Sequence, residues 1–346
     1  MRFLQITTKK YKKISDLTYT CESRVKYNEY VYRMLNKLLT DYKERFTYRM
    51  LKILLDTDLG ADCDDAGALA LLHRLADEKL CEILAVTHCT SEKSGAVAVK
   101  AINDWYNRGD ISVGQYDVKA FMEGERYTRY TCEIMDKYLE NHSVPKFENA
   151  VRVMRKALAS NNDVVIVVIG MLNNIAELLK SEADDISPLN GVELVKKSVS
   201  SMYVMGGNFE DLSYEEYNIV QDIESAQCVS KNFPVPIVYS GFELGTNVLT
   251  GDNLEHQVEE NPVRMAYSEW NKVVCGKEAF RRSSWDPITV YCAVIQDTPL
   301  FKKSAPKNIT FDDEGKTLVT DGGKDCYLIA KKSNEEVQEV LNQLIY

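Results

Sequence analysis

The stretch LLDTDLGADCDDAGALALL (residues 54–72) decides the fold, because a hydrophobic strand-like run leads through a polar loop into a helix-like run. In parallel α/β sheets, ligands bind where the strands end, so the polar loop marks a candidate binding site. Within ten positions the stretch carries five aspartates: Asp56, Asp58, Asp62, Asp64 and Asp65.

This density of negative charge requires an explanation. Two like charges about 4 Å apart repel by roughly 4 kcal/mol at an effective dielectric constant of 20. Helix capping accounts for Asp64 or Asp65, because acidic side chains favour the first turn of a helix, but it does not account for all five. A solvated acidic loop is the alternative to a bridging cation. Carboxylate oxygens are preferred ligands of Ca²⁺ and Mg²⁺, so the loop predicts a divalent metal site.

Outside this stretch, hydrophobic runs alternate with helix-like runs along the chain. Strands that are hydrophobic throughout, separated by helices, predict an open, mostly parallel sheet with helices on both faces. We expect strands over residues 51–58, 81–88, 163–170, 199–207 and 235–241, and helices over residues 64–77, 94–108, 149–160, 173–181, 222–231 and 334–346. A β-hairpin with glycine turns is expected over residues 307–332.

Charge divides the chain into two parts. Residues 1–49 carry twelve Lys or Arg and five Asp or Glu, whereas the remaining chain carries thirty basic and forty-seven acidic residues. We therefore expect a basic N-terminal extension over residues 1–49 and an α/β domain over residues 50–346. Hydrophobic residues recur at three- and four-residue steps from Tyr27 to Tyr42, which predicts an amphipathic helix within the extension.

Composition limits the classes of partner. The net charge of −10 argues against nucleic acid or an anionic membrane as the main partner, and no hydrophobic run has the length of a membrane span. The nine cysteines are odd in number and form no CxxC pair. They predict reduced thiols in the cytoplasm, with neither a disulfide framework nor a zinc site.

The aspartate loop resembles the N-terminal signature of the inosine–uridine-preferring nucleoside hydrolases. In that family a strand ends in Asp-x-Asp, a glycine follows, and an Asp-Asp pair opens a helix. Here the same pattern is D56-T-D58-L-G60-A-D62-C-D64-D65. The commoner form has a proline before the glycine and a loop two residues shorter. Because of this insertion, either Asp62 or Asp64 fills the ribose-binding position of the pair; we align Asp64 with it.

Three later segments also resemble the family. VVIVVIGMLNNIAELL (164–179) resembles its strand, glycine and Pro-Leu-Thr-Asn segment, with Met171 and Asn173 in place of the proline and threonine. YVMGGNFEDLSYEEYNIVQDIESA (203–226) places Glu216 and Asn218 on the family's ribose-binding pair, and Asn208 on a further ribose contact. RRSSWDPITVYCAVI (281–295) resembles the His-Asp-Pro segment that opens a later helix.

The resemblance covers residues 51 to about 300 and implies a nucleoside-hydrolase (Rossmann-like) fold and a set of roles. It implies that a Ca²⁺ ion is held by Asp58, Asp65, Asp286 and the Ile169 carbonyl. Asp58 would be the catalytic base that takes a proton from a Ca²⁺-bound water. Asp64, Asn208, Glu216 and Asn218 would bind the ribose, whose bond to the base is hydrolysed. The resemblance also implies a small-molecule nucleoside substrate and a homodimer or homotetramer.

Trp285 departs from the family pattern. Many members have at this position a histidine that protonates the leaving base, whereas some purine-preferring members have tryptophan, which stacks on the base. A large aromatic face suits a purine, so we expect Trp285 to bind the base and a purine to be preferred. Leaving-group protonation then comes from solvent or from another residue. His88 ends a predicted strand, and a structural role is expected for it.

Two other functions compete with nucleoside hydrolysis. One is a calcium- or ribosyl-binding module without turnover, which the absence of the histidine leaves open. The other is a Mg²⁺-dependent phosphatase of the haloacid-dehalogenase type, whose Asp-x-Asp motif also follows a strand. That phosphatase needs a second acidic pair after a later strand, and residues 163–174 do not supply one.

Overall fold

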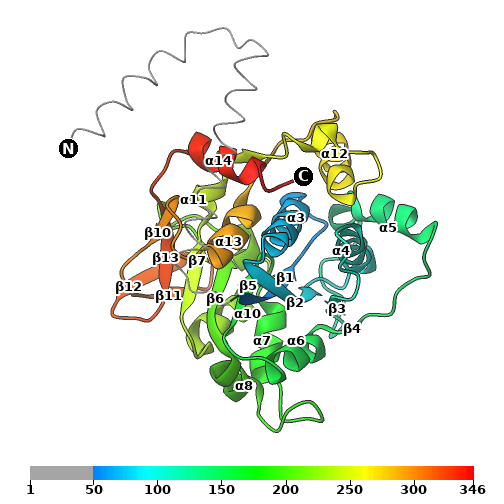
Figure 1. Cartoon of the computed structure of the whole chain (residues 1–346). Helices are drawn as coiled ribbons and strands as arrows, with labels where there is room; N and C mark the ends of the chain where they lie inside the picture. The colour runs from blue at the N-terminus through cyan, green and yellow to red at the C-terminus, as the bar shows by residue number, and fades with distance from the viewer. Residues whose placement is uncertain (1–49) are drawn as a thin grey trace, which may run out of the picture. The chain divides into compact units, whose positions relative to one another are not determined.

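The computed structural model describes residues 50–346, so the helix expected within residues 27–42 lies outside the described residues. The nine strands of the main sheet within residues 50–346 pair in a single order (Figure 1). That order is β10 (Phe301–Lys303), β13 (Cys326–Ala330), β7 (Ile237–Ser240), β6 (Val199–Met205), β5 (Val164–Val168), β1 (Leu51–Thr57), β2 (Cys81–His88), β3 (Ser112–Gln115) and β4 (Glu148–Asn149).

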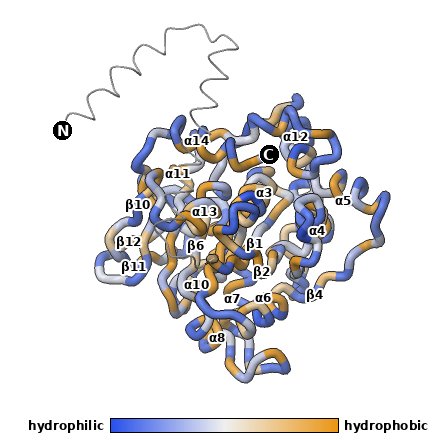
Figure 2. Tube along the Cα trace, viewed as in Figure 1, coloured by the Kyte–Doolittle hydropathy of each residue, from blue (hydrophilic) through white to orange (hydrophobic). Residues whose placement is uncertain are grey.

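All neighbouring strands of this sheet run parallel except β10 and β13, which pair antiparallel. The central strand β1 is buried from Ile53 to Thr57, and β5 is buried throughout. Strands covered on both faces cannot alternate polar and hydrophobic residues, which is why these runs are hydrophobic throughout. Hydrophobic residues accordingly occupy much of the central strands, which are largely orange in Figure 2.

Helices cover both faces of the sheet (Figure 1). One face carries α3 (Asp64–Asp77), α4 (Lys93–Trp105) and α13 (Trp285–Val294), with α12 (Pro262–Cys275) and α5 (Thr131–Leu139) packed against α3 and α4. The other face carries α6 (Ala150–Ala159), α7 (Asn173–Lys180), α8 (Gly191–Ser198) and α10 (Ile223–Asn232). This arrangement confirms the predicted α/β fold with an open, mostly parallel mixed sheet.

The remaining elements are short or lie at the C-terminus. The C-terminal α14 (Asn334–Asn342) lies where a helix was expected. The short elements are η1 (Glu125–Tyr127), α9 (Tyr217–Val220), α11 (Phe242–Gly245), β8 (Leu249–Thr250), η2 (Leu254–His256) and β9 (Arg282–Ser283). The expected hairpin is present as β11 (Lys307–Phe311) and β12 (Thr317–Asp321). The last strand of the expected region, β13, is not part of this hairpin and pairs with β7 in the main sheet.

Two findings bear on the membrane and cysteine predictions. No helix within residues 50–346 combines the length and apolar character that a membrane crossing needs. The eight cysteines in this range are all free thiols, and Cys63, Cys81, Cys89 and Cys292 are buried.

The topology places the ends of β1 and β5 side by side. From β1 the chain winds one way through β2 and β3, and from β5 it winds the other way through β6 and β7. The neighbouring strands β1 and β5 therefore form the topological switch point, where parallel α/β sheets bind ligands outside the carboxyl ends of their strands.

Candidate active site

A cavity of about 280 Å³ opens beyond the carboxyl ends of β1 and β5. Of the nine site residues predicted from sequence, the structure brings eight together as lining of this cavity: Asp58, Asp64, Asp65, Ile169, Glu216, Asn218, Trp285 and Asp286. They lie in α3, α9 and α13, at the N-cap of α9 and directly after β1 and β5, although they span more than two hundred residues of sequence.

Asn208 is the exception among these predictions, since it is not one of the described residues that line the cavity. Its Oδ1 accepts hydrogen bonds from the backbone N–H groups of Glu210, at 3.1 Å, and Asp211, at 2.8 Å. This side chain holds a turn, as asparagine often does in loops. The ribose contact expected for Asn208 stays a prediction, since these bonds engage only its Oδ1.

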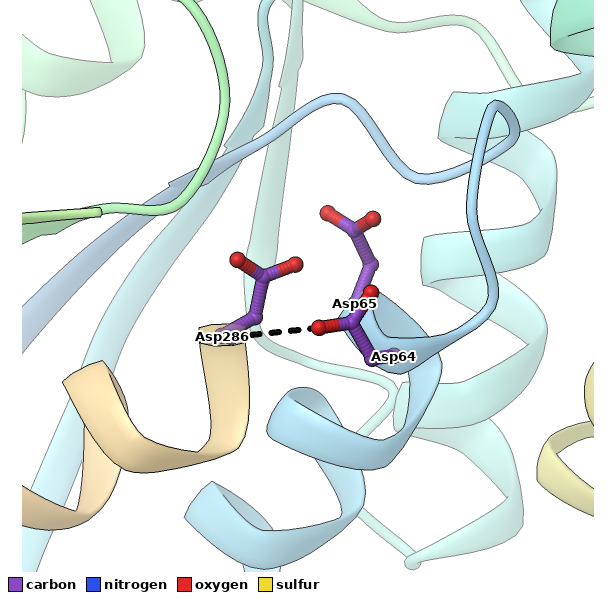
Figure 3. A group of neighbouring side chains, drawn as sticks. All are labelled: Asp64, Asp65 and Asp286. Atoms are coloured by element: carbon purple, nitrogen blue, oxygen red, sulfur yellow. Dashed lines mark hydrogen bonds between the residues drawn. The ribbon is translucent and has the colours of Figure 1, made fainter. Parts of the chain in front are cut away.

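Three of the carboxylates that line the cavity lie close together at the ends of two helices (Figure 3). Asp64, Asp65 and Asp286 each offer an oxygen, and these oxygens lie within 4.8 Å of one another. Asp64 and Asp65 occupy the first turn of α3, and Asp286 occupies the first turn of α13. The N-termini of two helices thus direct three buried acidic side chains toward one point.

Local hydrogen bonds fix this arrangement. The Oδ2 atom of Asp64 accepts the backbone N–H groups of Trp285, at 3.0 Å, and Asp286, at 3.2 Å. The N-cap residue of α13, Ser284, makes no side-chain capping bond. Asp64 of α3 instead satisfies the free N–H groups at the start of α13. On the other side, the hydroxyl of Thr57, at the end of β1, donates to Oδ1 of Asp65.

Asp58 lines the same cavity, although it is not part of the group of three. Gly170 allows its close approach: a Cβ added at Gly170 would lie 2.8 Å from the backbone nitrogen of Asp58 and 2.9 Å from its Oδ1. The preceding residue, Ile169, donates its N–H to the carbonyl of Asp56 at 2.9 Å. The pairing of β1 with β5 therefore sets Asp58 beside Ile169.

Burial shifts the titration of these carboxyl groups. It raises the pKa of Asp58 to about 7 and the pKa of Asp64 to about 8. Burial, together with the neighbouring aspartates, raises the pKa values of Asp65 and Asp286 well above their usual range. A cation among them would restore the ionised forms, because opposite charge favours the charged state. The three converging carboxylates are thus a donor set that fits a hard divalent ion.

Glu216 and Asn218 line the cavity at the start of the short helix α9. The carboxylate of Glu216 accepts the N–H groups of Gly207, Asn218 and Ile219 at 3.3, 3.0 and 3.2 Å. Burial raises the pKa of Glu216 to about 7. The Nδ2 atom of Asn218 lies 3.4 Å from the carbonyl oxygen of Ile169, so this amide and carbonyl form one polar edge of the cavity.

An aromatic and cationic wall faces this polar edge. The rings of Trp285 and Phe242 stack with centroids 5.4 Å apart, and Nε1 of Trp285 donates to the Phe242 carbonyl at 2.7 Å. The Arg282 guanidinium lies 4.4 Å from the ring centroid of Trp270 and 5.0 Å from that of Trp285. Arg282 also forms a salt bridge with Asp62, so the Asp62 carboxylate is already engaged and Asp64 stays the candidate for the ribose.

The profile of the family described as inosine-uridine preferring nucleoside hydrolase matches residues 53–343 of the chain. The chain belongs to this family. A comparison with curated proteins found no match.

Solved nucleoside hydrolases share the fold of this family member. The inosine-uridine preferring nucleoside hydrolase from Bacillus anthracis has a TM-score of 0.63 and 16% identity, covering 86% of this chain and 99% of that one. The purine-preferring ribonucleoside hydrolase from Gardnerella vaginalis has a TM-score of 0.61 and 18% identity, covering 85% and 98%. The type III effector XopQ, solved with adenosine diphosphate ribose, has a TM-score of 0.67 and 15% identity, covering 90% and 98%.

None of the described residues that line the cavity of this family member is a histidine. His88 is 1% exposed, and its Nδ1 and Nε2 lie 3.2 Å and 3.1 Å from the carbonyl oxygens of Thr90 and Leu59. Burial lowers the pKa of the imidazole. His88 therefore supports the loops around the aspartates, as expected from sequence.

Sequence reasoning missed several residues of the wall and rim. Arg282 stands three positions before Trp285 in a segment that was already singled out, and that proximity was the available signal. Tyr217 likewise stands between Glu216 and Asn218 in a segment already singled out. The others come from segments for which no motif was described, and only the fold places them at the cavity; they are Arg126, Arg129, Phe242 and Trp270.

Proposed function

We propose that this member of the family cleaves the N-glycosidic bond of ribonucleosides, with a purine preferred, to give ribose and the free base. One observation carries the proposal: the carboxylates of Asp58 and Asp65, from one loop, and of Asp286, from a distant segment, line a single cavity at the switch point of the sheet. The family match supports the reaction class, and the donor set of the cavity supports a metal-assisted hydrolysis.

Calcium is the ion that we assign to this site. Asp65 and Asp286, with Asp58 and the Ile169 carbonyl, would hold it, and oxygen-only donors suit Ca²⁺. When bound, such an ion lowers the pKa of water and engages ribose hydroxyls. Asp64, one of the three converging carboxylates, would share in holding the ion or the sugar.

The residues of the chain supply the remaining chemistry. Asp58 accepts a proton from the attacking water, whose oxygen forms a bond to C1′ of the ribose as the bond from C1′ to the base nitrogen breaks. The bond electrons go to the base, which takes up a proton. Asp64, Glu216 and Asn218 orient the ribose, and the negative field of the two carboxylates stabilises the positive charge that develops on the sugar.

The stacked rings of Trp285 and Phe242 account for the purine preference. Trp285 and Phe242 stack on each other beside the polar edge, and a purine extends this stack over a larger area than a pyrimidine does. Stacking on an aromatic face favours the protonated, electron-poor base. We propose that proton delivery comes from solvent or from a group other than histidine.

A nucleoside panel tests the proposal. Ribose release from inosine, adenosine, uridine and cytidine is measured with the full chain, in calcium and in excess chelator. We expect release in calcium, its loss in chelator and its recovery on adding calcium back, with higher kcat/KM for the purines. Chelator-insensitive release would contradict the metal site, and a pyrimidine preference would contradict the stacking.

The binding module without turnover is the second candidate, favoured by the absence of histidine among the described cavity residues. It predicts calcium-dependent nucleoside binding without any ribose release. The phosphatase alternative is not retained, because the family match assigns the chain elsewhere. We also propose a cytoplasmic homodimer or homotetramer, whose mass light scattering would measure.

A further inference from the structure

Two guanidinium groups at the rim of the cavity have no acidic partner within the described range. Arg126 belongs to η1 and is exposed, and Arg129 precedes α5 and is half-buried. Both line the cavity. Arg126 lies 4.8 Å from the ring centroid of Tyr217, and Nη1 of Arg129 donates to the carbonyl of Ala61 at 2.9 Å. Among residues 50–346, no carboxylate lies within 4.0 Å of either side chain.

The third cavity arginine provides a contrast. Arg282 is paired with Asp62 and enclosed by two tryptophan rings, so its charge is compensated within the protein. Arg126 and Arg129 direct uncompensated positive charge toward the ligand. A neutral nucleoside gives them no anionic partner, whereas a phosphate ester does, because a guanidinium matches phosphate oxygens with paired hydrogen bonds.

The placement of the ribose, which is taken from the proposed function, determines which of its substituents lies at the rim of the cavity. The base lies against Trp285, and the vicinal hydroxyls face the carboxylates of α3 and α13. The remaining substituent of the ribose, at C5′, then points toward Glu216 and Tyr217. Since Tyr217 contacts Arg126, the C5′ position faces the two arginines.

We propose that Arg126 and Arg129 form an anion subsite for a phosphate ester on C5′ of the ribosyl group. The ligand class is the nucleoside 5′-phosphates and compounds in which a diphosphate links the ribose to a second group. Arg126 binds the outer phosphate oxygens while stacked on Tyr217, and Arg129 closes the subsite from the loop that carries Ala61.

Calorimetry and kinetics test the subsite on the full chain in calcium at low salt. Adenosine, AMP and ADP-ribose serve as probes, and we expect AMP, ADP-ribose or both to bind at least ten-fold more tightly than adenosine. A gain with AMP identifies the monoester as sufficient, and a gain confined to ADP-ribose identifies the diphosphate. Equal binding of all three would overturn the proposal.

Variants identify the residues. The double variant Arg126→Ala/Arg129→Ala should lower the ratio of AMP to adenosine affinity to about one, and Arg126→Glu should lower it further. Arg152→Ala is the matched control, because Arg152 lies on α6 and pairs with Glu148 and Asp185 outside the cavity. If the arginines only offset the acidic field, both ligands weaken equally and the ratio stays constant, which would contradict the subsite.

Ribose release from adenosine, measured in parallel, separates this inference from the proposed function. Release without a phosphate preference refutes the subsite and leaves the hydrolase standing. A phosphate preference in binding without release from any ligand refutes hydrolysis and leaves the subsite standing.

Discussion

The aspartates of the loop differ in what holds them. Asp62 is bound by Arg282, Asp64 by the N-terminus of α13 and Asp65 by the hydroxyl of Thr57. Asp58 shows no comparable side-chain partner within residues 50–346. A carboxylate engaged by a guanidinium has its charge satisfied and is a poor base, whereas one buried without a partner is suited to accept a proton. This difference supports Asp58 as the base.

The first prediction concerns Asp58→Asn. Because the amide cannot take a proton from water, ribose release should fall at least about 10²-fold. The variant removes one charge from a crowded buried group, so thermal stability in chelator should be equal or higher. Asp110→Asn, at an exposed position outside the cavity, is the control. Activity close to that of the control would exclude Asp58 as the base.

The second prediction concerns Trp285→Ala. Loss of the stacking face should lower the ratio of kcat/KM for inosine to that for uridine by about 2- to 12-fold, the range of an aromatic pair. Trp105→Ala, at 38% exposure on α4, is the control. Circular dichroism should show that both variants fold. An unchanged ratio would mean that another group selects the base.

Single residues were predictable from sequence only where a motif carries them. The aspartates follow a strand in a recognisable order, so their meeting was expected. The turn that Asn208 holds was not predicted, because a loop asparagine that holds a turn looks the same in sequence as one that binds sugar. The pair of Asp62 with Arg282 joins residues 220 positions apart, and no local pattern encodes it.

At the scale of elements, the loop between β1 and α3 depends on Gly60. Its φ is +147°, and an added Cβ would lie 2.3 Å from the Tyr127 carbonyl oxygen. The predicted bounds of α3 and β2 coincide with those observed, because strong hydrophobic runs end at clear breaks. Sequence reasoning missed α8 and α12, although Asn190 with Glu193 forms a capping box and Asn261-Pro262 opens α12.

The third prediction therefore concerns Gly60→Ala. The strained φ and the carbonyl contact should lower the free energy of unfolding by about 1–3 kcal/mol and weaken calcium binding, because the loop carries the aspartates. Urea unfolding and calcium titration measure both effects. The control Gly276→Ala has a φ of +69° with open space around it and should leave calcium affinity unchanged. Equal effects of the two variants would show that the loop tolerates the side chain.

For the whole molecule, the sheet order was the part least accessible to pattern reading. Alternating strands and helices predict a parallel sheet, but they do not predict which strands are neighbours. In the structure β5 pairs with β1, although β5 begins 107 residues after β1 ends. That pairing creates the switch point and brings Ile169 to Asp58. The resemblance of the later segments to a family supplied what periodicity alone lacks, because long-range pairing leaves no local signal.

The last prediction joins the site to the stability of the molecule. Burial raises the pKa of Asp58 and of Glu216 to about 7 and that of Asp64 to about 8, whereas carboxyl groups of an unfolded chain titrate near 4. The metal-free folded protein therefore binds these protons more tightly than the unfolded chain does. The stability they contribute is fully present below about pH 4 and is lost as the pH rises through 7 to 8.

Calcium should reverse this dependence, because protons compete with the ion for the same oxygens. In chelator, the melting temperature should be lower at pH 8.5 than at pH 5.5. At a calcium concentration one hundred times Kd, the gain at pH 8.5 should be about 2.7 kcal/mol, or about 4 °C, and smaller at pH 5.5. Calorimetry at both pH values measures it, with Asp286→Asn expected to reduce the gain. An equal shift at both pH values would contradict a calcium site made of the buried carboxylates.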